Sequence, residues 1–510
     1  MSKKKLLKST GIIGLATSIS RVLGFIRDIV IANFFGTALY AQAFVVAFRI
    51  PNLLRDLVGE GATNAAVVPV LTEELTKKGK NDFFKLAQVL FNILLVVLVV
   101  LTILGILASP LIIRLIAPGF SIDKEKFDTT VALTRILFPF LILVGLWAYA
   151  MGVLNSLGHF ALPAFGPSLL NLSMILCAMW FGENIFGLAT GVLVGGMLQL
   201  VIQFPPLYLN GWTMKFTREF SHPQAKKVGI LLIPRALGAC VYQVNVFIST
   251  ILASLSSIVG DGAVAALYYA NRVWQLPLAI FGIALAQAVL PTMSRHVALN
   301  DTDKLKETLS FSLKVLFFIL IPSSVGLIVL RTPITKVLFQ RGAFTSYSTY
   351  ITSDALLFYA IGLVACGGIK ILVSAFYSMH DTTTPVKTAI ASLVLNIILN
   401  LALMWPMKVG GLALATSISA TFNFIALYIL LRRRLGDFGT KDAADSLVRV
   451  ASASVIMGII LKFLAICFPH FTFLSLFGII ATGIATFVLF SHIFNVREMK
   501  DALAWITKKR

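Results

Sequence analysis

Apolar stretches of about 20 residues recur along the whole chain, and this is the helix length needed to cross the hydrocarbon core of a bilayer. Of the 510 residues, 58% are hydrophobic and 13% are charged, and the mean hydropathy is +0.90. Soluble domains rarely exceed about half apolar residues, and one or two soluble cores could not bury so many apolar segments. The sequence therefore predicts an integral membrane protein.

The apolar segments predict an all-α polytopic fold with about 14 transmembrane helices. The expected spans are residues 10–34, 40–76, 83–109, 128–156, 160–181, 186–208, 228–256, 264–295, 308–330, 350–379, 385–405, 410–432, 446–467 and 472–495. An even number of spans places both termini on the same side of the membrane.

The net charge of +21 does not indicate a nucleic-acid-binding protein, because the basic residues lie mainly in short loops between apolar segments. Loops and termini on one side hold about 26 Lys or Arg, and those on the other side hold about 7. The more basic side is cytoplasmic by the positive-inside rule. We therefore expect cytoplasmic termini and cytoplasmic loops near Lys78, Arg218, Lys304 and Arg433.

The chain also repeats itself with an offset of about 222 to 225 residues. Leu170-Asn171 matches Leu395-Asn396, and Gly187-Leu188-Ala189 matches Gly411-Leu412-Ala413. A repeat unit of six helices keeps its orientation, so the sequence predicts two parallel six-helix lobes with a substrate site between them. The expected division is an N-lobe over residues 1–212, a C-lobe over residues 213–436, and two extra helices within residues 437–510.

The first predicted helix carries charge in the middle of an apolar segment. It contains Arg21, Arg27 and Asp28. An Arg at a helix centre costs about 2.5–3.5 kcal/mol on insertion scales, so such side chains normally face the bundle interior or a wet cavity. One interpretation is a ligand-binding site, and the alternative is a structural ion pair between Arg27 and Asp28 or with another helix.

Two further helices carry similar residues. The second holds Arg49, Arg55, Asp56 and Glu60, and the eighth holds Arg272 near the repeat position of Arg49. Arginines outnumber acids among these residues, and the planar guanidinium suits bidentate binding of phosphate. The pattern predicts a net positive cavity that binds an anion such as a diphosphate.

The sequence indicates neither a bound cofactor nor a nucleotide-hydrolysing domain, because no GxxxxGK[ST] loop is present. An ion gradient, the membrane potential or the substrate gradient must then drive transport. Asn396, Asn400 and Thr416 are possible oxygen ligands for a monovalent cation, although the sequence favours interhelical hydrogen bonds as their role. The isolated cysteines predict neither a zinc site nor a disulfide framework.

Several segments resemble one known family along nearly the full chain. They are Ser20-Arg21-Val22-Leu23-Gly24-Phe25-Ile26-Arg27-Asp28, Asn52-Leu53-Leu54-Arg55 with Gly59-Glu60-Gly61-Ala62, Tyr269-Ala270-Asn271-Arg272, Leu338-Phe339-Gln340-Arg341-Gly342 and Thr384-Pro385-Val386-Lys387. The chain is similar to the MurJ/MviN lipid II flippases of the MOP superfamily. The resemblance implies a transporter rather than an enzyme, located in the bacterial cytoplasmic (inner) membrane and serving peptidoglycan synthesis.

The resemblance also implies roles for individual residues. It implies that lipid II, an undecaprenyl-diphosphate glycopeptide, binds at the central residues Arg21, Arg27, Asp28, Arg49, Arg55, Glu60 and Arg272. It implies alternating access between two lobes and a groove for the lipid tail at the last two helices. Members with a sodium site use acids where this chain has Ser249 and Asn400, so we expect sodium coordination to be weak or absent here.

Other functions remain open from the sequence. The chain could be a flippase for another polyprenyl-diphosphate glycan or a MATE-like exporter, although a cation exporter would favour an acidic cavity. A polytopic enzyme would need paired acids at a membrane face, which the sequence does not clearly place. A third alternative is a scaffold for other cell-wall synthesis proteins, but this function leaves the intramembrane arginines unexplained. Other cell-wall synthesis proteins and membrane lipids are expected partners of a transporter as well.

Overall fold

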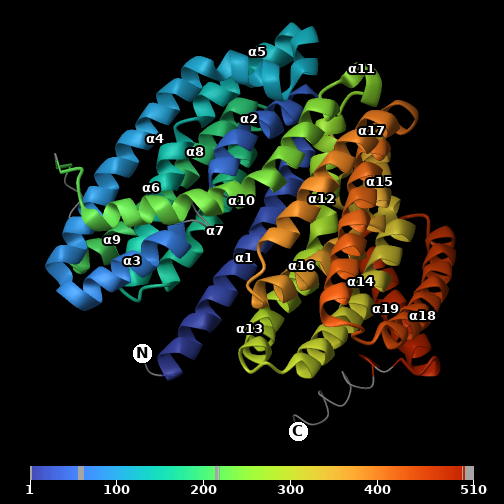
Figure 1. Ribbon diagram of the computed structural model, residues 1–510. Helices are drawn as coiled ribbons and strands as arrows, with labels where there is room; N and C mark the ends of the chain where they lie inside the picture. The colour runs from blue at the N-terminus through green and yellow to red at the C-terminus, as the bar shows by residue number, and fades with distance from the viewer. Residues whose placement is uncertain (1–2, 56–62, 213–215, 218, 497, 500–510) are drawn as a thin grey trace. The chain divides into compact units, whose positions relative to one another are not determined.

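The structure is a computed structural model that describes residues 3–55, 63–212, 216–217, 219–496 and 498–499, and the described part contains helices and no strands (Figure 1). Helices α1 to α10 are Lys3–Phe35, Leu39–Arg55, Thr63–Lys78, Lys80–Ile116, Lys124–Leu137, Phe140–Ser156, Ala161–Phe181, Ile185–Val201, Phe204–Leu209 and Pro223–Ala253. Helices α11 to α19 are Ser256–Val259, Ala263–Pro277, Ala284–Ala298, Thr302–Phe339, Ser346–Ile361, Leu363–Ser378, Thr383–Leu435, Thr440–Cys467 and Phe473–Ile493. A short 3-10 helix, η2 (Pro118–Ile122), and a short π-helix, η3 (Leu278–Ile283), complete the list.

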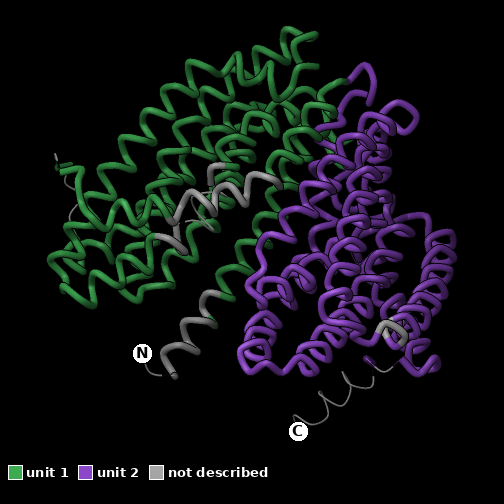
Figure 2. Tube along the Cα trace, in the orientation of Figure 1, with its two compact units in different colours: residues 1–255, 341–344 green, residues 256–340, 345–510 purple. Residues whose placement is uncertain are grey.

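The chain divides into two compact units (Figure 2). Unit 1 comprises Met1–Leu255 with Arg341–Phe344, and unit 2 comprises Ser256–Gln340 with Thr345–Arg510. Helix α10 packs on α3 and α4 and so belongs to unit 1. The boundary between the compact units therefore lies after α10, whereas the repeat predicts a lobe boundary before α10, at residue 212. The division into lobes by the repeat stays a prediction.

Each expected span has a helical counterpart in the described part of the chain, which confirms the all-α polytopic fold. The second span corresponds to α2 and α3, and its interrupted centre lies outside the described residues. Two expected spans are joined in α17, where Lys408 breaks the helix with φ 50° and ψ −128°. Within the described residues, nine helices are long and apolar enough to cross a membrane, or ten if the bent pair α15–α16 is one span.

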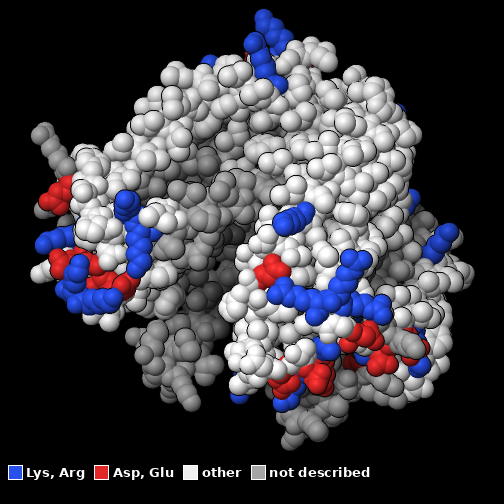
Figure 3. All heavy atoms as spheres, viewed as in Figure 1, with Lys and Arg blue, Asp and Glu red and all other residues white. Residues whose placement is uncertain are grey.

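Apolar side chains cover much of the outer surface of both units. Trp180 of α7 is 86% exposed, and Leu107 of α4 is 71% exposed. On the visible face of unit 2, charged side chains gather toward one end of the helices, while most of the remaining surface is uncharged (Figure 3). A broad apolar surface of this kind would be costly in water and is suited to lipid. The chain is a multi-pass membrane protein.

Inside each unit the helices pack through small residues and a continuous apolar core. In unit 1, α7 packs against both α1 and α8, and Gly191 of α8 lies so close to α7 that a Cβ there would lie only 2.8 Å from the Cβ of Cys177. In unit 2, α13, α14 and α16 enclose a core that includes Met293, Leu309 and Ile371. Close packing through small residues is the usual mode of helix association in membranes. It fixes the positions of the few polar residues between the helices.

Candidate functional site

The charges of α1 form a buried pair. Arg27 is 6% exposed and Asp28 is 1% exposed. The Nε and one terminal nitrogen of Arg27 donate to Oδ1 of Asp28 at 3.0 and 2.7 Å. Adjacent positions on a helix point about 100° apart, so the long arginine side chain must fold back to reach its neighbour. The ion pair between Arg27 and Asp28, which was the alternative interpretation of these charges, is therefore present.

A third residue, which the sequence analysis named as part of the repeat but not as a site residue, completes this cluster. Asn171 of α7 accepts a hydrogen bond from the other terminal nitrogen of Arg27 at 2.9 Å. Its Nδ2 donates to the backbone carbonyl of Ser20 at 3.0 Å. Gly24 of α1 faces Asn171, and a Cβ at Gly24 would lie 3.4 Å from the amide nitrogen. The small residue lets α7 bring its carboxamide against α1, and Asn171 thereby orients the guanidinium.

The remaining predicted site residues of unit 1 lie in different surroundings. Arg21 is exposed on α1 and makes no hydrogen bond or ion pair within the described part of the chain. Arg49 of α2 is half-buried and donates to the backbone carbonyl of Val246 in α10 at 3.1 Å. Arg55 ends α2, and its side chain lies outside the described residues, as do Asp56 and Glu60. The structure thus groups Arg27 with Asp28, and Arg49 helps to hold α2 against α10.

Arg272 belongs to unit 2. It is half-buried on α12, donates to the hydroxyl of Tyr268 at 3.2 Å and lies 4.9 Å from the centre of that ring. A guanidinium over an aromatic face gains a cation–π contact while its edge still carries donors. Because Arg272 and the arginines of α1 and α2 lie on different units, their convergence on one ligand stays a prediction.

The possible cation ligands form a hydrogen-bonded ladder on α17. Asn396 and Asn400 are fully buried, and Asn400 donates to the carboxamide oxygen of Asn396 at 2.7 Å. Asn396 in turn donates to the hydroxyl of Ser419 at 3.1 Å, and Thr416 donates to a backbone carbonyl one turn away. The one carboxamide oxygen of the pair without a donor is that of Asn400.

These oxygen atoms do not fit a site that would bind sodium strongly. They are neutral, and most of them are already hydrogen-bonded, whereas hard cations favour carboxylates. Ser249 lies on α10 of unit 1, whereas the two asparagines belong to unit 2, so their convergence on one ion stays a prediction. No group of three His, Cys, Asp or Glu that could hold a metal occurs among the residues that the structure describes. Cys177, Cys366 and Cys467 are free thiols.

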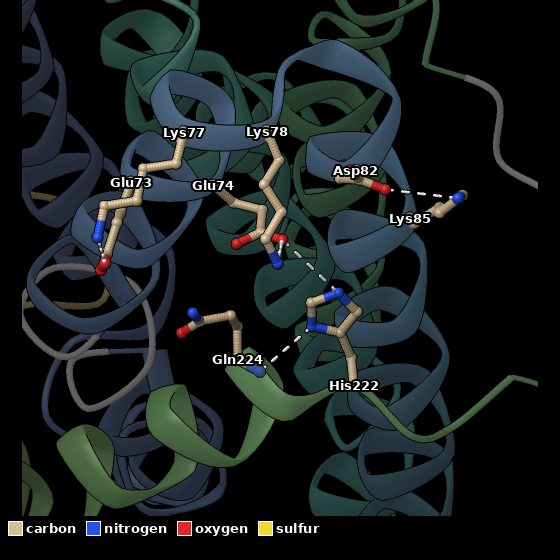
Figure 4. A network of polar contacts seen from close by, with 8 residues as sticks. All are labelled: Glu73, Glu74, Lys77, Lys78, Asp82, Lys85, His222 and Gln224. Atoms are coloured by element: carbon tan, nitrogen blue, oxygen red, sulfur yellow. Dashed lines mark hydrogen bonds and ion pairs between the residues drawn. The ribbon is translucent and has the colours of Figure 1, made fainter.

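A second polar cluster, absent from the predicted site, joins α3 to α10 (Figure 4). Glu74 is 2% exposed, pairs with Lys78 at 2.9 Å and lies 3.9 Å from Nε2 of His222. His222 caps α10, since its Nδ1 accepts the backbone amide of Gln224 at 3.2 Å. Beside it, Glu73 pairs with both Lys77 and Lys227 at 2.7 Å. The spacing of Glu73-Glu74 and Lys77-Lys78 could have signalled the pairs within α3 but not those to α10.

The comparisons with known proteins agree with one another. The model of the family described as "Lipid II flippase MurJ" matches residues 31–482. A Vibrio cholerae protein named "Probable lipid II flippase MurJ" is 36% identical over 98% of both chains. A Burkholderia cenocepacia protein named "Lipid II flippase MurJ" is 35% identical over 82% of both chains.

Solved structures with the same fold are also known. One entitled "Lipid II flippase MurJ, inward closed conformation" superposes with a TM-score of 0.80 at 28% identity, covering 94% of this chain and 98% of the other. An inward-facing MATE multidrug transporter of the MOP superfamily has a TM-score of 0.69 at 14% identity, covering 84% and 98%, which shows a shared fold alone. The family match along most of the chain, together with these relatives, shows that the chain belongs to the MurJ family of lipid II flippases.

Proposed function

We propose that this protein moves lipid II from the cytoplasmic to the outer leaflet of the bacterial inner membrane. Membership of a family whose named relatives are lipid II flippases supports a transport role, with lipid II as the substrate. The observation that carries the chemistry is the buried guanidinium of Arg27, which Asp28 and Asn171 orient inside a membrane helix. Buried charges at membrane depth typically mark substrate pathways.

The diphosphate of lipid II is the group that these arginines suit. Arg21 is exposed and carries no counterion within the described residues, so it can meet an anionic group without first breaking an ion pair. Arg27 is already engaged by Asp28, and a diphosphate would compete for its donors. Breaking a buried ion pair is costly, so diphosphate binding must replace the contacts that Arg27 makes in this structure. In the proposal Arg49, Arg55, Glu60 and Arg272 complete the polar lining.

The proposal includes alternating access between the two lobes, with the diphosphate held by arginines from both. It assigns the lipid tail to the last two helices, α18 and α19, whose outer faces expose Phe463 and Phe477. Both termini lie on the cytoplasmic side because the basic loops gather there. Cysteine labelling of Lys304→Cys and Ser121→Cys tests this, and access to Lys304→Cys from outside would reverse the orientation.

The second candidate function is transport of another polyprenyl-diphosphate glycan, since the arginines recognise the diphosphate and not the sugar. A MATE-like export role is suggested by the shared fold. A drug cation would be repelled by Arg21, and Asp28 is already neutralised by Arg27. The geometry therefore favours an anionic substrate.

Complementation of a strain depleted of its lipid II flippase tests the proposal. Lipid II at the outer face is measured with an enzyme that cleaves only exposed molecules. The wild-type chain should restore both growth and outer-face lipid II, whereas Arg21→Ala should reach the membrane in normal amounts and restore neither. Growth without recovery of outer-face lipid II would reject lipid II transport, and normal flipping by Arg21→Ala would reject the arginine site.

A further inference from the structure

A polar cavity lies within unit 2, at the start of α18 and just after the end of α19. It is partly open, and its cavity volume of about 30 Å³ is enough for one small polar group such as an ammonium. Its lining residues come from α14, α18 and the segment after α19, and they are Lys314, Asp442, Asp445, Ser446, Arg449, Asn495, Val496 and Glu498. Acids and bases therefore face one small space at the end of a membrane helix pair.

The carboxylate of Glu498 is the unusual group in this cavity. Glu498 is 6% exposed. Its Oε1 accepts a hydrogen bond from the hydroxyl of Ser446 at 2.9 Å, while its Oε2 is buried and has no hydrogen-bond partner within the described chain. A buried carboxylate oxygen without a donor is costly, so a donor that the protein itself does not supply would be bound favourably.

The basic residues of the cavity differ in their availability. Arg449 pairs with Asp445 at 2.9 Å and donates to the backbone carbonyl of Phe494 at 3.1 Å, so it is held in place by two contacts. Lys314 of α14 is half-buried and makes no ion pair or hydrogen bond in the part of the chain described here. The cavity thus holds a carboxylate with one unsatisfied oxygen, Oε2 of Glu498, and a lysine, Lys314, that has no partner within the described residues.

The helices that line the cavity also expose large apolar side chains. Val448 beside Arg449 is 61% exposed, Phe311 one turn before Lys314 is 51% exposed, and Ile493 at the end of α19 is 54% exposed. Polar groups bordered by exposed apolar side chains match an amphiphile whose headgroup is charged and whose chains remain in the bilayer. A soluble ligand would have no use for the apolar border.

We propose that this cavity binds the headgroup of a zwitterionic phospholipid with a primary amine, of the phosphatidylethanolamine class. The ammonium group donates to Oε2 of Glu498, and the phosphate accepts from Lys314 and Arg449. A primary ammonium carries three donors, whereas the quaternary ammonium of phosphatidylcholine carries none. The site is separate from the flippase proposal, and it binds a lipid of the surrounding membrane rather than the transported one.

Lipid binding to the full-length protein in detergent tests the assignment. Native mass spectrometry and thermal unfolding are measured with phosphatidylethanolamine, phosphatidylcholine and phosphatidylglycerol of identical chains. We expect phosphatidylethanolamine to bind most tightly, and Glu498→Gln to reduce its preference over phosphatidylcholine about tenfold, which corresponds to about 1.4 kcal/mol. Glu307→Gln, an exposed acid on α14, is the matched control and should leave the preference unchanged.

Lys314→Met separates the two halves of the headgroup. It should weaken binding of phosphatidylethanolamine and phosphatidylcholine alike and leave the amine preference intact. Equal binding of these two lipids to the wild type, or an unchanged preference in Glu498→Gln, would overturn the proposal. Equal protection by free ethanolamine would also overturn it, since the ligand would then be a soluble amine. A loss of stability in Lys314→Met that is the same with and without lipid would show instead that Lys314 pairs with Glu498.

Discussion

The guanidinium of Arg27 in α1 donates to the carboxamide oxygen of Asn171 in α7 at 2.9 Å. The same carboxamide donates to the backbone carbonyl of Ser20, about two helix turns before Arg27. One side chain therefore fixes both the backbone of α1 and the direction of its buried charge. This makes Asn171 a positioning residue for Arg27.

Asn171→Ala should lower both stability and transport. It removes the acceptor of a charged donor and leaves Arg27 partly unsatisfied, at a cost of roughly 1–3 kcal/mol. Asn171→Asp keeps an acceptor for Arg27 and should recover more transport than Asn171→Ala at equal membrane abundance. Thermal unfolding and complementation are the measurements, with the exposed Asn81→Ala as control. If Asn171→Asp and Asn171→Ala transport equally, the orienting role is wrong.

The pair of Arg27 and Asp28 can be dissected by a double substitution. Removing one partner of a buried pair is strongly destabilising, by about 3–5 kcal/mol, because a lone charge remains. Asp28→Ala should therefore lower the amount of folded protein, and adding Arg27→Ala should restore it. If Arg27 binds diphosphate, the double variant should fold but not flip lipid II. Recovery of both abundance and flipping would leave Arg27 a purely structural role.

Arg27→Lys gives an independent test of the same arginine. A lysine keeps the charge but cannot contact Asp28 and Asn171 with a planar fork of donors. We expect outer-face lipid II to fall while membrane abundance stays close to that of the wild type. Full activity of Arg27→Lys would show that charge suffices and that the geometry of the guanidinium is unimportant.

The sequence predicted the helices well and the polar contacts only in part. The break in α17 at Lys408 falls between the expected spans 385–405 and 410–432. The sequence located it because the length of an apolar segment identifies a membrane helix directly. The intramembrane charges were also visible from the sequence. Their surroundings were not, since Arg21 is exposed while Arg27, on the same helix, is 6% exposed.

The missing information concerns partners that lie far apart in the chain. Asn171 reaches Arg27 across 144 residues, and His222 approaches Glu74 from another helix. Periodicity places residues on a face of one helix and says nothing about which helix packs there. The repeat does link Asn171 with Asn396, but the two residues make different contacts, with Arg27 in one unit and with Ser419 in the other.

Gly342 should tolerate no side chain. Its φ is +54°, and a Cβ there would overlap the backbone carbonyl oxygen of Asn33. The same oxygen accepts a hydrogen bond from the backbone amide of the adjacent Ala343 at 2.8 Å. A left-handed backbone costs other residues about 1–2 kcal/mol, and the overlap adds to this. Gly342→Ala should therefore lower the unfolding temperature. Gly158→Ala is the control, because Gly158 has φ +83° but open space around it; an equal loss in both variants would exclude a role for the Asn33 contact.

Asp381, in the turn between α16 and α17, should make stability depend on acid pH. The backbone amide and then the hydroxyl of Thr384 hold its pKa below the usual 3.8, with Arg434 contributing at 2.7 Å. A lowered folded pKa stabilises the protein above pH 3.8, and this stabilisation is lost as pH falls through the folded pKa. The gap in unfolding temperature between wild type and Asp381→Asn should be constant near neutral pH and shrink below about pH 4. A gap in unfolding temperature that persists at low pH would contradict this prediction. The control is Asp303→Asn at an exposed acid, and its unfolding temperature should equal that of the wild type at each pH.

The last prediction concerns the driving force. A diphosphate that leaves the cytoplasm carries negative charge toward the positive side of the membrane, and each charge gains about 2.3 kcal/mol per 100 mV. The ladder of Asn396 and Asn400 offers sodium no carboxylate, and the carboxamide oxygen of Asn396 is already occupied. Transport in proteoliposomes should therefore continue without sodium and fall when the membrane potential is collapsed. Thr416→Ala removes a further oxygen and should change neither result. A strict sodium requirement in the wild type, with transport lost in Thr416→Ala or Asn396→Ala, would instead establish sodium coupling through these residues.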